Sequence, residues 1–141
     1  METNYFGTLA MCRAFAPVLA ANGGGAIANV LSIAARAGMP AMGSLCASKA
    51  AALRMTECLR VELAPQGTAV VGFMPSAVDT AMTRGIDMPK SRPEDAAAAL
   101  LDAVERGRED VVFGAGAEHI ERMLASDRAG LLRQLGAAVH R

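Results

Sequence analysis

Apolar positions along the chain alternate between helical spacing and short unbroken runs. Residues spaced three or four apart predict four amphipathic helices, at residues 3–21, 45–63, 93–104 and 117–135. Short apolar runs separate them, at residues 26–32, 68–74 and 111–113. Runs of this length and composition are typical of strands that are covered on both faces. The sequence therefore predicts helix and strand in alternation from one end to the other.

Residues that start or stop helices lie at most of these boundaries. The first helix contains Pro17, expected to kink or stop it, and is followed by Asn22 and three glycines suited to a helix C-terminus. Ser44 is a suitable N-cap for the second helix, which Pro65 and Gly67 end. The last helix is expected to break near Gly130.

Alternation of this kind predicts parallel βαβ units with right-handed connections. The expected fold class is α/β, a partial Rossmann-like (doubly wound) parallel sheet of about three strands with helices on both faces. The first strand, residues 26–32, has no predicted neighbour on its outer side. Because a long apolar edge strand tends to pair with another chain, these 141 residues are expected to form half of a larger domain.

Composition excludes several classes of function. Hydrophobic residues make up 52% of the chain and the formal net charge is zero, which predicts a folded core and no nucleic-acid partner. Apolar stretches are interrupted before the roughly 18 residues that a membrane span needs, and no secretory leader is visible, so a cytoplasmic protein is expected. Cys12, Cys46 and Cys58 lack metal-ligand spacing, so we expect free thiols and no metal site.

Polar residues gather where the strands are predicted to end. Gly23–Gly25 precedes a strand, and the glycines after residues 111–113 have no later strand to complete a βαβ unit, so neither cluster is expected to bind phosphate. Ser32 ends the first predicted strand and Ser76 follows the second, while Lys49 lies early in the helix between them. Open α/β sheets bind ligands at this carboxyl edge, so a site is predicted there.

Several ordered motifs resemble the short-chain dehydrogenase/reductase family. Asn29-Val-Leu-Ser32 and Leu45-Cys-Ala-Ser-Lys49 are similar to the family's Asn-x-x-Ser and Tyr-x-Ala-Ser-Lys motifs, at the expected separation. Asn4-Tyr-Phe-Gly7 is similar to an Asn-x-x-Gly helix, and Pro75-Ser-Ala-Val-Asp-Thr80 to a Pro-Gly-x-Val-x-Thr segment. The resemblance covers nearly the whole chain.

The resemblance implies hydride transfer between NAD or NADP and the carbon of a small carbonyl or alcohol substrate. Three catalytic positions of the family are retained here, at Asn4, Ser32 and Lys49. The residues that would hold the nicotinamide and its ribose are Lys49, Pro75, Ser76, Val78 and Thr80.

Three departures from the family pattern predict that the isolated chain is inactive. Leu45 stands where the family has the tyrosine that acts as general acid/base, and Ser76 stands where it has glycine. The resemblance also assigns all of residues 1–141 to the C-terminal half of the domain, with the dinucleotide-binding half expected to be absent. Cys46 and Tyr5 are poor substitutes, since Cys46 is about 100° around the helix from Leu45 and Tyr5 is on another helix.

Two other interpretations stay open. The chain is alternatively a non-catalytic assembly module that pairs with itself or with a full-length relative through helices 3–21 and 45–63, which in the family form a four-helix bundle between subunits. A further alternative is an internal start within a longer reading frame, or a pseudogene product. The substrate loop at residues 82–90 identifies no substrate, and nothing here distinguishes NAD from NADP.

Overall fold

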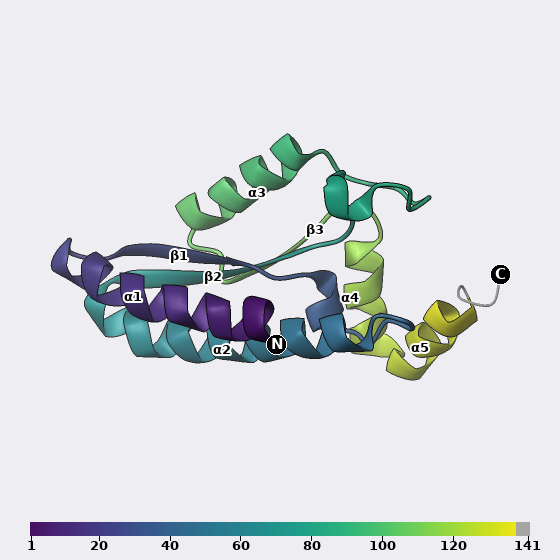
Figure 1. The fold of residues 1–141 in the computed structure, drawn as a ribbon, viewed down its shortest axis with the longest axis horizontal. Coiled ribbons are helices and arrows are strands. Elements are labelled where there is room, and N and C mark those ends of the chain that lie inside the picture. The colour runs from purple at the N-terminus through teal and green to yellow at the C-terminus, as the bar shows by residue number, and fades with distance from the viewer. Residues whose placement is uncertain (138–141) are drawn as a thin grey trace.

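In the computed structural model, which describes residues 1–137, a three-stranded parallel sheet lies between layers of helices (Figure 1). The strands are β1 (Gly25–Val30), β2 (Thr68–Pro75) and β3 (Asp110–Phe113), in the spatial order β1-β2-β3. The predicted fold class is confirmed. No helix among residues 1–137 is long and apolar enough to cross a bilayer.

The helices cover the two faces of the sheet unequally. Helices α1 (Thr8–Ala21) and α2 (Gly43–Leu63) lie side by side on one face, and α3 (Pro93–Glu105) lies alone on the other (Figure 1). Helices α4 (Ala117–Ser126) and α5 (Arg128–Ala137) lie toward the end where the strands finish. The core is densest under α2, where Leu53 and Ala52 are fully buried against Met74 of β2.

Strand β1 is an edge strand within the described part of the chain, as predicted. It pairs only with β2, from Gly25 beside Thr68 to Val30 beside Phe73. Its side chains toward α1 and α2 are covered, with Asn29 buried. The alternate side chains on the opposite face are exposed: Ala26, Ala28 and Val30. Both the edge and one face of β1 are thus open.

The first helix differs from the prediction at its start and confirms it at its end. Residues Glu2–Gly7 form a π-helical segment that leads directly into α1. Pro17 does not stop α1, which continues to Ala21. The helix ends at Asn22, as predicted, where the Asn22 backbone N–H and side-chain amide both donate to the Val18 carbonyl, at 3.2 and 2.9 Å.

Three other predicted boundaries are wrong by a few residues. Helix α2 begins at Gly43, after Met42, so Ser44 is inside the helix and does not cap it. Strand β1 ends at Val30, and Ser32 instead caps a short 3-10 turn at residues 33–35. The last helix breaks at Asp127 and not at Gly130, because the Asp127 carboxylate accepts the Gly130 N–H at 2.8 Å and caps α5.

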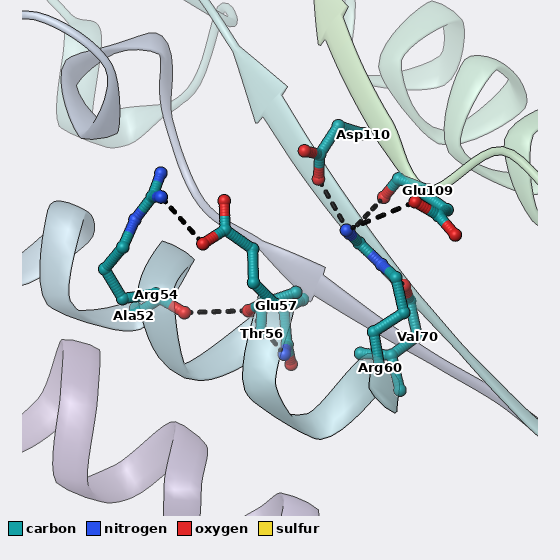
Figure 2. Close-up of polar contacts among 9 residues, drawn as sticks. Ala52, Arg54, Thr56, Glu57, Arg60, Val70, Glu109 and Asp110 are labelled. Carbon is teal, nitrogen blue, oxygen red and sulfur yellow. Dashed lines mark hydrogen bonds and ion pairs between the residues drawn. The ribbon is translucent and has the colours of Figure 1, made fainter. Parts of the chain in front are cut away.

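Arg60 joins α2 to strands β2 and β3. Its side chain is only 16% exposed, and its guanidinium donates to the Val70 carbonyl (3.0 Å), the Glu109 carbonyl (2.8 Å) and the Asp110 carboxylate (2.7 Å) (Figure 2). A planar guanidinium with several fixed donors suits such a junction. Arg60 therefore holds the start of β3 against the last turn of α2.

Replacing Arg60 by methionine is expected to lower the free energy of unfolding by about 2–4 kcal/mol, because it removes a largely buried guanidinium that donates to two carbonyls and a carboxylate at once. Arg54→Met is the matched control on the same helix. Arg54 makes one exposed ion pair with Glu57, at 2.7 Å (Figure 2), and its loss should cost about 0.5 kcal/mol or less. Urea unfolding measures both, and equal midpoints for the two variants would contradict the assignment.

Candidate functional site

Ser32 and Pro75 lie side by side at the carboxyl edge of the sheet. The Leu31 N–H donates to the Phe73 carbonyl at 2.7 Å, so the ladder continues one residue beyond β1 and brings Ser32 next to the end of β2. The Ser32 hydroxyl oxygen accepts the Ala34 N–H at 3.1 Å. A hydroxyl that accepts this bond keeps its own proton, so Ser32 can still donate to a substrate oxygen.

Lys49 reaches the same edge from α2. Its ammonium donates to the Val30 carbonyl at 3.0 Å, two residues before Ser32. The lysine is half-buried, and within residues 1–137 it forms no ion pair. Burial lowers the pKa of Lys49, because desolvation disfavours the charged form. An ammonium has three donors, so two remain for ligand hydroxyls.

Asn4 lies beside α2 and does not contact Lys49 or Ser32 directly. Its amide donates to the Ser48 hydroxyl at 3.0 Å, and that hydroxyl donates to the Leu45 carbonyl at 2.9 Å. The Thr8 hydroxyl donates to the Asn4 carbonyl at 3.1 Å. Ser48 is buried and was not singled out from the sequence, although it precedes Lys49 directly. Asn4 is thus bonded to the residue that immediately precedes Lys49 in the chain.

Leu45 lies one helical turn before Lys49, so the two share a face of α2. It is half-buried and offers no proton. Neither nearby titratable group replaces it. Cys46 is buried, and its sulfur accepts the Met39 N–H at 3.3 Å. Tyr5 packs against the core that contains Cys12 and Met55.

The segment after β2 is an ordered loop. The Ser76 N–H donates to the Phe113 carbonyl at 2.8 Å, and Val78 bridges to Ser91. Thr80 caps the 3-10 turn Ala81–Thr83, where the Thr80 N–H donates to the Thr83 hydroxyl at 3.1 Å. The structure therefore places Pro75, Ser76, Val78 and Thr80 on one segment that begins at the same sheet edge as Ser32.

A separate hollow of about 490 Å³ lies between α2 and α4. Its charged side chains largely pair with one another: Arg36 with Glu121 at 2.9 Å and Arg54 with Glu57 at 2.7 Å. None of the predicted site residues lines it. In the described part of the chain, no three metal-ligating side chains come together.

Replacing Lys49 by methionine is expected to stabilise the fold at neutral pH. The pKa of Lys49 is lower in the folded state than in the unfolded state, so between these two pKa values the folded state binds fewer protons. The free energy of unfolding therefore rises with pH in that range. Lys49→Met removes the cost of burying the charge and abolishes this rise. Melting temperatures at pH 7 and at mildly alkaline pH test it, with Lys90→Met, at the only other lysine, as control. A lower melting temperature for Lys49→Met at pH 7 would contradict it.

Solved structures match this fold along almost its whole length. A short chain dehydrogenase from Burkholderia cenocepacia, crystallised with NADP, is 52% identical with a TM-score of 0.90, covering 96% of this chain and 56% of its own. A short-chain dehydrogenase from Sphingobium yanoikuyae, crystallised with NADPH, is 27% identical with a TM-score of 0.73, covering 92% of this chain and 53% of its own.

A curated protein is also similar to this chain. The short chain dehydrogenase mpl6 of Monascus purpureus is 35% identical over 112 residues, which is 79% of this chain and 36% of that protein. The chain thus spans about a third of this curated relative and about half of the solved ones. The family model described as short chain dehydrogenase matches residues 1–90. With more than half of its length matched, the chain belongs to the short-chain dehydrogenase family.

Proposed function

We propose that residues 1–141 are the C-terminal half of a short-chain dehydrogenase domain whose ancestral activity is NAD(P)-dependent carbonyl or alcohol oxidoreduction, and that the isolated chain is inactive. The observation that carries this is the carboxyl edge of the sheet. There the Lys49 ammonium of α2 contacts the carbonyl of Val30, two residues before Ser32 in the chain, and apolar Leu45 lies one turn before Lys49.

The open side of β1 supports the half-domain proposal. Its outer edge is unpaired within residues 1–137, and Ala26, Ala28 and Val30 are exposed on the face that α3 leaves uncovered. A further parallel strand and a helix would bury both surfaces. The Monascus purpureus and Burkholderia cenocepacia relatives are long enough to contain such elements, since this chain spans 36% and 56% of their lengths.

The residues at this edge fit the nicotinamide half of NAD or NADP. Lys49 has two donors left for ribose hydroxyls, and the segment from Pro75 to Thr80, which begins at the same sheet edge, would lie beside the carboxamide. When bound, the nicotinamide supplies or accepts the hydride. Ser32 would orient the substrate oxygen. Asn4, through Ser48, would support the start of α2.

Leu45 is the reason to expect no turnover. Reduction of a carbonyl leaves an alkoxide that needs a proton, and a leucine side chain has none to give. Loss of a general acid typically costs roughly 10²–10⁴-fold in rate. Cys46 and Tyr5 are occupied elsewhere, so neither compensates.

The test is NADH- and NADPH-dependent reduction of a broad panel of aldehydes and ketones by the purified chain. We expect no turnover above that of Lys49→Met; turnover that Lys49→Met abolishes would overturn the proposed inactivity.

Immunoblotting of source cells with an antibody against α5 tests the proposal that residues 1–141 are half of a domain. A clearly heavier species would mean that these residues belong to a complete domain, and a 14.5 kDa band would direct the search to binding partners.

The alternative function, an assembly module, is favoured by the outer face of α1. Met11, Phe15 and Val18 are 50–58% exposed and are spaced four and three residues apart, so they form one apolar ridge. We propose that this ridge pairs with a second copy or with a full-length relative. Sedimentation should show a dimer or larger species that Phe15→Arg dissociates. A monomer at all concentrations, with no capture of a relative, would refute it.

A further inference from the structure

A buried chain of hydrogen bonds crosses from α1 through β1 to α2. The Cys12 thiol donates to the Asn29 side-chain oxygen at 3.6 Å, and the Asn29 amide donates to the Thr56 hydroxyl at 3.0 Å. The Thr56 hydroxyl donates to the Ala52 carbonyl at 2.8 Å, the contact drawn in Figure 2. Cys12, Asn29 and Thr56 are each at most 6% exposed. Burial raises the pKa of Cys12, which keeps the thiol protonated as a donor.

Hydrophobic packing alone does not explain why an asparagine and a threonine occupy these buried positions. A buried amide and a buried hydroxyl each cost free energy unless they are hydrogen-bonded, whereas leucine and valine of similar size would carry no such cost. A fully partnered polar network in a core instead specifies one arrangement of the elements that carry it. Here that arrangement is the position of α2 against β1.

The network lies directly beside the contact made by Lys49. Asn29 immediately precedes Val30, whose carbonyl accepts the Lys49 ammonium at 3.0 Å. Thr56 follows Lys49 by seven residues, about two turns of helix, so both project from the same face of α2. Strand β1 and helix α2 are thus joined by two hydrogen bonds, Asn29–Thr56 in the core and Val30–Lys49 at the candidate site. A shift of α2 along β1 that breaks the core bond also moves Lys49 relative to Val30.

We propose that Asn29 and Thr56 are positioning residues, which fix α2 on β1 so that the Lys49 ammonium is held at the Val30 carbonyl. The inference deepens the proposed function, because Lys49 is the residue assigned there to the nicotinamide ribose. The position of the ammonium can be measured without cofactor.

The chain has only two lysines, Lys49 and Lys90, so labelling with ¹³C-lysine gives two side-chain Cε signals whose pH titration can be followed by NMR. Thr56→Val removes both hydroxyl bonds at nearly constant volume. We expect its Lys49 midpoint to move upward, toward that of denatured protein, as the ammonium leaves the Val30 carbonyl for water. Thr56→Ser restores the hydroxyl and should restore the wild-type midpoint.

Leu131→Ala, at a buried position of α5, is the control for general loosening, and it should leave the Lys49 midpoint unchanged. A folded Thr56→Val protein with the wild-type Lys49 midpoint would overturn the proposal. Should that variant not fold, Asn29→Ala breaks the same β1–α2 bond from the strand side, and an unchanged Lys49 midpoint there would overturn the proposal equally. Turnover that Lys49→Met abolishes would refute the proposed inactivity and leave this result standing.

Discussion

In the complete domain to which we propose that residues 1–141 belong, replacing Leu45 by tyrosine is expected to raise carbonyl reduction by roughly 10²–10⁴-fold, the range that a positioned general acid contributes. A phenol at position 45 would lie one turn from Lys49 on the same face of α2. The nearby ammonium would favour the phenolate and so lower the phenol's pKa toward neutrality. NADPH oxidation with a panel of small ketones measures the gain.

Leu45→Phe is the matched control, because it introduces the same ring without the hydroxyl. Equal rates for the tyrosine and phenylalanine variants would show that position 45 does not supply the proton. Adding Lys49→Met to the tyrosine variant should remove most of the gain. A second readout needs no turnover: since Tyr5 is the only tyrosine, the ultraviolet titration difference between the Leu45→Tyr variant and wild type isolates the new phenol.

The exposure of Leu45 makes this substitution a fair test. Leu45 is half-buried in the first turns of α2, where Ser44 and Ala47 are exposed, so a larger ring can extend toward solvent. The next residue, Cys46, is buried and accepts a backbone bond, so enlarging it would disturb the loop before α2. If Leu45→Tyr gives no gain in rate, misfolding is therefore not the expected reason, and the unfolding curve of the variant would show that it still folds.

The sheet and the shared edge of Ser32, Lys49 and Pro75 could be predicted because their signals are local or topological. Buried parallel strands appear in the sequence as continuous apolar runs, and parallel strands bring their carboxyl ends to one edge. The same reasoning found the open edge of β1. It required only the number of strands and the direction of their connections.

Contacts between residues far apart in the chain could not be predicted from the sequence. The Asn4–Ser48 bond joins residues 44 positions apart, the Asn29–Thr56 bond 27, and the Arg60–Asp110 bond 50. No periodicity records such a pairing. The break at Asp127 also depended on which side chain reached a free backbone group, so it lies three residues before Gly130, and Pro17 does not stop α1.

Replacing Gly24 by alanine is expected to cost about 4 kcal/mol or more, a large part of the roughly 5–15 kcal/mol that stabilises a typical domain. Gly24 has φ of +109°, which disfavours any side chain, and a Cβ there would lie 2.8 Å from the Gly67 carbonyl carbon and closer still to its oxygen. Both partners are backbone atoms, so the clash cannot be relieved by a rotamer change. Yield of folded protein and urea midpoint measure the effect.

Gly23→Ala separates the clash from the backbone strain. Gly23 also has positive φ, +84°, but a Cβ there meets no atom within 4 Å, so the cost should be only about 1–2 kcal/mol. Equal losses for the two variants would show that the Gly67 contact is unimportant. The contact matters because the β1–β2 register begins beside it, where Gly25 donates to the Gly67 carbonyl at 3.1 Å and pairs with Thr68. Separating β1 from β2 at this end would displace Ser32 from Pro75 at the other, since one ladder connects both ends.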